Sequence, residues 1–124
     1  MHDIVVDCAH PASLARFWAA VLDDYAVAPY DEAELARLRR LGFAGPEEDP
    51  TVMVEPLNGG PRLWFQLVPE PKRGKNRIHL DLRAPDAETE ITRLTGLGAR
   101  VAARLPEWTV MTDPEGNEFC VAEG

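Results

Sequence analysis

Residues 4–22, Ile-Val-Val-Asp-Cys-Ala-His-Pro-Ala-Ser-Leu-Ala-Arg-Phe-Trp-Ala-Ala-Val-Leu, hold the pattern that decides the fold. The β-branched run at the start predicts a strand over residues 4–8, and Pro11 suits the first turn of a helix. Apolar residues then recur at positions 14, 17, 18, 21 and 22, the spacing of an amphipathic helix that covers a core. We therefore expect a strand followed directly by a helix packed on a sheet.

Three short strands are expected to complete the first half: residues 25–29, 51–55 and 62–68. An extra short helix is expected near residues 31–42, because Asp31 and Glu34 have the spacing of a capping box and Gly42 suits the end of a helix. The polar, proline-bearing connector of residues 69–75 then separates this half from the next.

The second half repeats the same order of elements. A strand is expected over residues 77–82, followed by a helix that begins near Pro85 and is ended by Gly98. Three more strands are expected after it: residues 100–103, 108–111 and 118–121.

A local match supports an internal repeat, since Asp7 and Asp81 each stand four residues before a proline, Pro11 and Pro85, that opens a helix. At 124 residues the chain is long enough for one core. We therefore expect a single α+β domain of two βαβββ modules, about 1–70 and 75–124, whose curved mixed sheets surround a cavity. The helix near 31–42 is an insertion in the first module.

The charge and the apolar pattern exclude several classes of partner. Thirteen Lys and Arg against 21 Asp and Glu give a formal charge of −8, which repels nucleic acid. No apolar run approaches the roughly 20 residues of a membrane span, and the N-terminus lacks the pattern of a signal peptide, so we expect a cytoplasmic protein with no membrane partner. The two cysteines, Cys8 and Cys120, are expected to be reduced and buried.

Several of these motifs together resemble the vicinal oxygen chelate superfamily of glyoxalases, bleomycin-resistance proteins and dioxygenases. They are the first strand with its helix ending in Phe17-Trp18-x-x-Val21-Leu22, His79 at the start of a central strand, and Asp113-Pro-Glu-Gly-Asn117 before the last strand. Residues 68–82 are similar to the small glyoxalase-like domains of actinobacterial type. The resemblance implies two curved four-stranded sheets, each with a helix behind it, that enclose a cavity, and members of this length often form homodimers.

Metal-dependent members of the superfamily hold one ligand on the first and last strand of each half. The resemblance carries these four positions to Asp3, Gln66, His79 and Cys120. No single metal ion suits all four groups, because they are a hard carboxylate, a weakly binding amide, an imidazole and a soft thiol. We therefore expect no metal or other cofactor. His79 and Asp3 are the two candidates for a divalent metal if one binds.

Strand alternation predicts which side chains line the cavity. If His79 lies on the inner face, Arg77 and Asp81 lie there too, while Ile78, Leu80 and Leu82 turn towards the helix. The same rule gives the full set of ligand-binding candidates: Arg62, Trp64, Gln66, Arg77, His79 and Cys120. An alternative interpretation is that these residues only mark the wet face of an antiparallel sheet.

Three functions are open at this point. The first is a metal-independent binding domain for an aromatic or anionic small molecule, with Trp64 as a stacking surface and Arg77 as the anion partner. The second is a lyase, isomerase or oxygenase in which His79 acts as a general base with Asp7 or Asp81, with or without a divalent metal. The third is a non-catalytic interaction domain.

Overall fold

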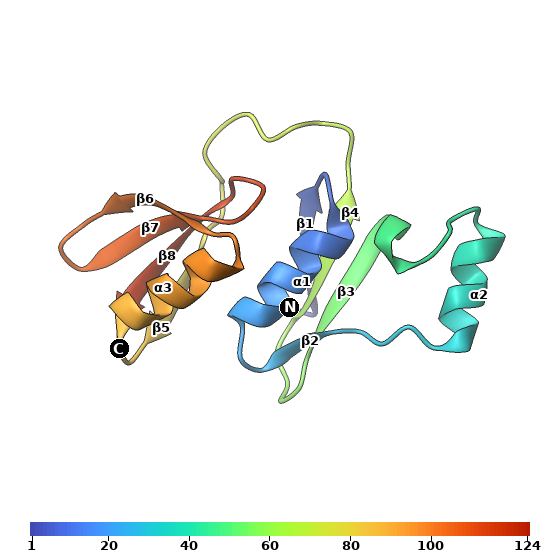
Figure 1. Cartoon of the computed structure of the whole chain (residues 1–124), viewed down its shortest axis with the longest axis horizontal. Helices are drawn as coiled ribbons and strands as arrows, with labels where there is room; N and C mark the ends of the chain where they lie inside the picture. Colours follow the sequence, from blue (N-terminus) through green and yellow to red (C-terminus); the bar gives the residue numbers. More distant parts are fainter. The chain divides into compact units, whose positions relative to one another are not determined.

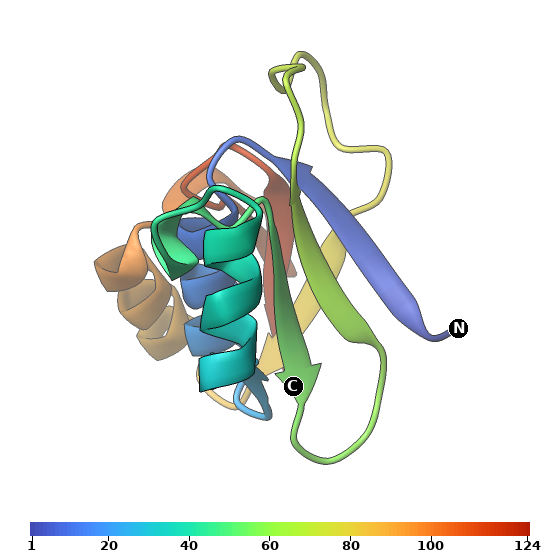
Figure 2. The same ribbon diagram turned by 90° about the vertical axis from the view of Figure 1, so that its right-hand side faces the viewer.

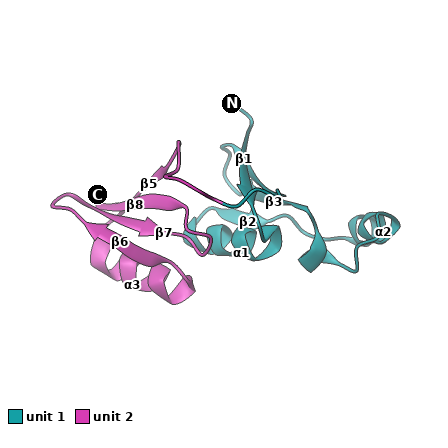
Figure 3. Ribbon diagram, turned by 90° about the horizontal axis from the view of Figure 1, so that it is seen from above, with its two compact units in different colours: residues 1–71 teal, residues 72–124 magenta.

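The two halves of the chain fold as two units, Met1–Pro71 and Lys72–Gly124, in a computed structural model that describes all residues 1–124 (Figure 3). Each unit contains a strand, a helix and three further strands in that order, which confirms the two βαβββ modules and the α+β class. The longest helices have 11 residues, and none is long and apolar enough to cross a bilayer.

The sheet of the first unit has the strand order β1-β4-β3-β2, with β1 parallel to β4 and the other pairs antiparallel (Figure 1). Its elements are β1 (Asp3–Cys8), α1 (Pro11–Val21), β2 (Tyr25–Val27), β3 (Thr51–Pro56) and β4 (Arg62–Leu67). In Figure 2, β1 (blue), β4 (yellow-green) and β3 (green) lie side by side. All of the strands expected in this half are confirmed within a few residues.

The core of the first unit forms where α1 packs against β2, β3 and β4. Pro11 occupies the first turn of α1, as expected. Leu14 and Phe65 are buried almost completely, and the rings of Phe17 and Trp18 meet edge to face with centroids 5.4 Å apart. The apolar stripe of residues 14–21 therefore covers the sheet.

The insertion in the first module contains α2 (Glu32–Arg40) and the short 3₁₀ helix η1 (Pro46–Glu48). Asp31 caps α2, because its carboxylate accepts a hydrogen bond of 2.8 Å from the Glu34 backbone N–H. The reciprocal bond of a capping box is not made, since the Glu34 carboxylate accepts from the Arg37 guanidinium instead. Gly42 follows the helix at φ +92°, a conformation that favours glycine.

The sheet of the second unit has the strand order β5-β8-β7-β6, with β5 parallel to β8 and the other pairs antiparallel. Its elements are β5 (Leu80–Ala84), α3 (Ala87–Leu97), β6 (Arg100–Arg104), β7 (Trp108–Thr112) and β8 (Glu118–Glu123). Asp86 caps α3 by accepting from the Thr89 backbone N–H, and Gly98 ends the helix at φ +117°. Phe119 and Leu94 are fully buried where α3 lies on the sheet.

The strand expected over residues 77–82 begins only at Leu80. Ile78, which was expected to face the helix, is 82% exposed, and Arg77 lies in a bend before the strand. The neighbouring strand β8 starts at Glu118, so residues before 79 extend past the end of their partner and cannot pair with it. The prediction of strand structure at Arg77 and of burial at Ile78 was therefore wrong.

The internal repeat is present in the structure, but the residues that are structurally equivalent are shifted by two positions from the sequence match of Asp7 with Asp81. Cys8 and Ala84 each end the first strand of a module, are buried, and stand three residues before the first residue of a helix. Pro11 is that first helical residue, whereas Pro85 precedes the cap of α3. The structure therefore makes Asp7 equivalent to Arg83 and Asp3 equivalent to His79.

Candidate functional site

The second unit contains a hollow of about 480 Å³ on the sheet face opposite the buried side chains of Phe119, Val121 and Met111. All of its lining residues belong to this unit. Its floor is formed by side chains from β5, β8 and β7: Asp81, Arg83, Cys120, Ala122, Val110 and Trp108.

The strand register arranges this floor in rows. Asp81, Cys120 and Val110 lie opposite one another in one row, and Arg83, Ala122 and Trp108 form the next. Neighbouring strands are about 4.8 Å apart, and a step of two residues along a strand is about 6.6 Å. The two rows therefore describe a floor large enough for a small organic molecule.

The sheet face is open over the inner strand β8 because the β8 residues on this face, Cys120 and Ala122, are small. In the equivalent register of the first unit, Trp64 stands where Cys120 does and Gln66 where Ala122 does. The position of Trp108 is held there by Thr51, the first residue of β3. The large aromatic ring thus occupies the centre of the sheet face in the first unit and the margin in the second.

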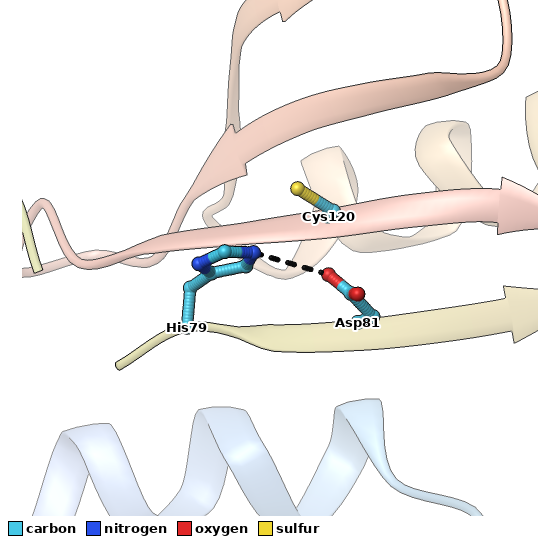
Figure 4. Close-up of side chains that lie close together, drawn as sticks. All are labelled: His79, Asp81 and Cys120. Carbon is cyan, nitrogen blue, oxygen red and sulfur yellow. Dashed lines mark ion pairs between the residues drawn. The ribbon is translucent and has the colours of Figure 1, made fainter. Parts of the chain in front are cut away.

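Three polar side chains that line the hollow, His79, Asp81 and Cys120, converge at the end of the sheet where β5 begins (Figure 4). His79 Nε2 lies 3.3 Å from Asp81 Oδ1. One imidazole nitrogen of His79, one carboxylate oxygen of Asp81 and the Cys120 Sγ all lie within 4.8 Å of one another. Burial raises the pKa of the Cys120 thiol, and the charge of Asp81 and its hydrogen bond with the thiol raise it further. The arrangement therefore keeps the thiol protonated and does not make it a nucleophile.

The connector before β5 is fixed to the same end of the sheet by Glu118. The Glu118 carboxylate accepts from the Asn76 backbone N–H at 3.0 Å and from the Lys72 ammonium at 3.3 Å. The Asn76 N–H and the Lys72 ammonium hold the pKa of Glu118 below its usual value. Lys75 lines the hollow between these two residues and has no carboxylate partner.

The predicted site residues of the first unit lie on one sheet face and pair among themselves. Arg62 donates to both oxygens of Asp3, at 2.7 and 3.0 Å, and its guanidinium lies 5.5 Å from the centre of the Trp64 ring. The Arg62 hydrogen bonds lower the pKa of Asp3 to about 2. Asp7 and Gln66 are opposite one another on β1 and β4 and are exposed.

These contacts test the four metal positions that the resemblance implies. Asp3 is neutralised by the Arg62 guanidinium, which would repel a cation. The structural equivalent of Cys120 is Trp64 and not Gln66, and an indole offers no metal ligand. The residues present therefore do not fit a four-ligand site. His79, Asp81 and Cys120 are the group of donors that could hold an ion, and binding would require the thiol to lose its proton.

A second hollow, of about 550 Å³, lies in the first unit beside the start of α1 and carries three acidic residues. Each of them is already bound within the chain. Glu47 pairs with Arg16 at 2.9 Å, Glu48 accepts from a backbone N–H, and Asp49 accepts from the Tyr30 hydroxyl. The three carboxylates of this hollow are therefore already engaged in contacts within the chain.

The structure brings some of the predicted site residues together and separates others. His79, Asp81 and Cys120 lie together in the hollow of the second unit, whereas Arg77 does not line it. Trp108 was missed, although Thr109 and Met111 are buried and strand alternation on β7 would have placed Trp108 on the open face. The cavity shared by both modules stays a prediction.

Comparison with known proteins supports the architecture. The model of a family described as a glyoxalase-like domain matches residues 3–122. No curated protein matches the chain.

Solved structures share the whole fold at low sequence identity. A glyoxalase/bleomycin resistance protein/dioxygenase family enzyme from Burkholderia phytofirmans PsJN is 11% identical, with a TM-score of 0.66 over 97% of this chain and 94% of that one. The fosfomycin resistance protein FosX from Mesorhizobium loti is 13% identical, with a TM-score of 0.66 over 100% and 90%. At these identities the likeness shows the fold alone.

Proposed function

Because the chain belongs to the glyoxalase-like domain family, within the vicinal oxygen chelate superfamily that its motifs resemble, we propose that it binds a small organic molecule in the hollow of its second module. Binding requires no metal ion. The observation that carries this proposal is the floor of small residues, Cys120 and Ala122, with the half-exposed ring of Trp108 at its margin. An apolar surface beside a few convergent polar groups is the usual composition of a ligand site.

A thermal-shift screen of aromatic and anionic fragments tests this function. We expect some fragments to raise the melting temperature of the wild-type chain, because a ligand that binds only the folded state stabilises it. The Trp108→Ala variant should lose these shifts, whereas Trp64→Ala, which removes an indole from the first unit, should keep them.

The same screen tests the role of metal. We expect the fragment shifts to be unchanged by a chelator and by added Ni²⁺, Zn²⁺ or Mn²⁺, and we expect elemental analysis to find no stoichiometric metal. A bound metal whose removal abolishes the fragment shifts would overturn metal-independent binding.

A proton-transfer enzyme is the second candidate, and the 3.3 Å pair of His79 and Asp81 favours it. A carboxylate that orients an imidazole is the arrangement of a general base. Asp7, the other partner considered for His79, lies on β1 of the first unit and is opposite Gln66. The test is carbon-bound hydrogen exchange of the fragments in D₂O, followed by NMR. If the wild type accelerates the exchange and His79→Ala does not, the protein catalyses this proton transfer. If the wild type does not accelerate it, ligand binding is the remaining function.

We also propose that the chain forms a homodimer. Val101 and Leu105, on the edge strand β6 and just after it, are each more than 40% exposed, and exposed apolar side chains at a strand edge favour association. Light scattering after gel filtration should give twice the 13.7 kDa chain mass. A mass of one chain would overturn the dimer.

A further inference from the structure

The hollow of the second module has two ends that differ in chemistry. One end is the row of Ala122 and Trp108, and the other is the start of β8 at Glu118, four residues earlier along the same strand. Four residues of strand span about 13 Å, which is the length of a fused ring system with a short side chain. A ligand that fills the hollow therefore touches both ends at once.

The Trp108 end favours a planar apolar group. Trp108 is 43% exposed, and its strand neighbour Ala122 has too small a side chain to cover the indole face. Two residues of opposite formal charge, Arg83 and Glu107, line this end as well. The end therefore has no net charge to attract an ion, and it offers a ring surface for stacking.

The Glu118 end favours an anion. The negative charge of Glu118 is offset by the Lys72 ammonium. The Asp81 carboxylate lies 3.3 Å from His79 Nε2 and accepts a hydrogen bond from the Cys120 thiol. The ammonium of Lys75 is the cation at this end with no carboxylate partner. It lies close enough to Cys120 for its charge to act on the thiol.

From these two ends we propose that the ligand is a flat aromatic or fused-ring molecule that carries a single anionic group, with the ring on Trp108 and the anion at Lys75. The inference rests on the proposed function, because it names the class of molecule that this hollow binds. It narrows the sequence prediction of an aromatic or anionic ligand to a single molecule that carries both features, at opposite ends of a hollow about 13 Å long.

Three naphthalene derivatives with different head groups test the charge: naphthylacetate, naphthylethanol and naphthylethylammonium. Affinity is measured by titration of the isotope-labelled chain, using the indole N–H signal of Trp108 assigned by Trp108→Phe. We expect naphthylacetate to bind about fivefold more tightly than naphthylethanol, the effect of one partly exposed ion pair. The ammonium compound should bind most weakly.

Two variants of the connector separate the local role of Lys75 from the net charge of the chain. Lys75→Gln should remove the preference for naphthylacetate over naphthylethanol. Arg73→Gln removes the same charge two residues away, outside the hollow, and should keep the preference. Ala122→Leu should weaken all three compounds, since the added side chain fills the space beside Trp108.

The outcomes distinguish this inference from the function on which it rests. Three results would each overturn the claim that the ligand carries an anionic group, while the hollow remains a binding site. They are equal binding of the three compounds, tightest binding of the ammonium compound, and an unchanged preference in Lys75→Gln. The proposed function itself would be overturned if no fragment in the thermal-shift screen gave a melting-temperature shift that Trp108→Ala abolishes.

Discussion

Replacing Asp81 by asparagine should lower the pKa of the Cys120 thiol and increase its rate of alkylation. The carboxylate and the sulfur lie within 4.8 Å of each other, and the Asp81 side chain is 72% exposed. At that distance in a water-like environment, one charge acts on another with about 0.9 kcal/mol, or about 0.6 of a pH unit. The thiolate fraction at neutral pH should therefore rise about fourfold.

The rate of reaction rises by less than the thiolate fraction, because a thiolate of lower pKa is a weaker nucleophile. With that compensation we expect iodoacetamide to react about twofold faster with Asp81→Asn than with the parent. The parent for both measurements carries Cys8→Ala, so that Cys120 is the reacting thiol, and pH–rate profiles give both pKa values. A pKa that does not change, or that increases in Asp81→Asn, would refute the placement of the carboxylate beside the thiol.

Three further changes test the fold. Gly98→Ala should lower the free energy of unfolding by about 1 kcal/mol, because Gly98 has φ +117°, whereas Gly96→Ala within α3 should raise it by about 0.5 kcal/mol. Urea denaturation measures both, and equal effects would contradict the assignment of Gly98 as the residue that ends α3. The carboxyl of Asp3 has a pKa of about 2 in the folded chain against an ordinary 3.8, so it contributes stability above that ordinary value, which is lost as the pH falls towards 2. Arg62→Gln should remove this part of the acid dependence, and an NMR titration of Asp3 that still ends near 2 in the variant would be inconsistent with the pair. Phe119→Ala should cost about 3–5 kcal/mol in urea denaturation, because the ring is fully buried under α3, and a loss below 1 kcal/mol would contradict that burial.

The element order could be predicted from the sequence because each element carries its own local pattern. The stripe from Leu14 to Val21 and the cap at Asp86 depend only on residues a few positions apart, and both are present in the structure. The prediction of a strand at Arg77 was wrong because strand pairing there depends on where β8 begins, 41 residues later in the chain. Local alternation carries no information about the end of a distant partner strand.

The candidate site could be predicted only in part for the same reason. His79, Asp81 and Cys120 were expected on the open face from strand alternation, and they lie there together. Alternation could not indicate that Trp64 fills the centre of one sheet face while Cys120 leaves the centre of the other open, since that comparison needs the register of both modules. Trp108 becomes important only once Ala122 is known to be its neighbour.

The most direct test of ligand binding in the second module is an NMR titration of the labelled chain with the tightest fragment from the thermal-shift screen. The structure predicts that the Trp108 indole signal and the amide signals of Val110 and Cys120 shift together and saturate with a single affinity. Shifts confined to residues 1–71, or the absence of any saturable shift, would contradict it.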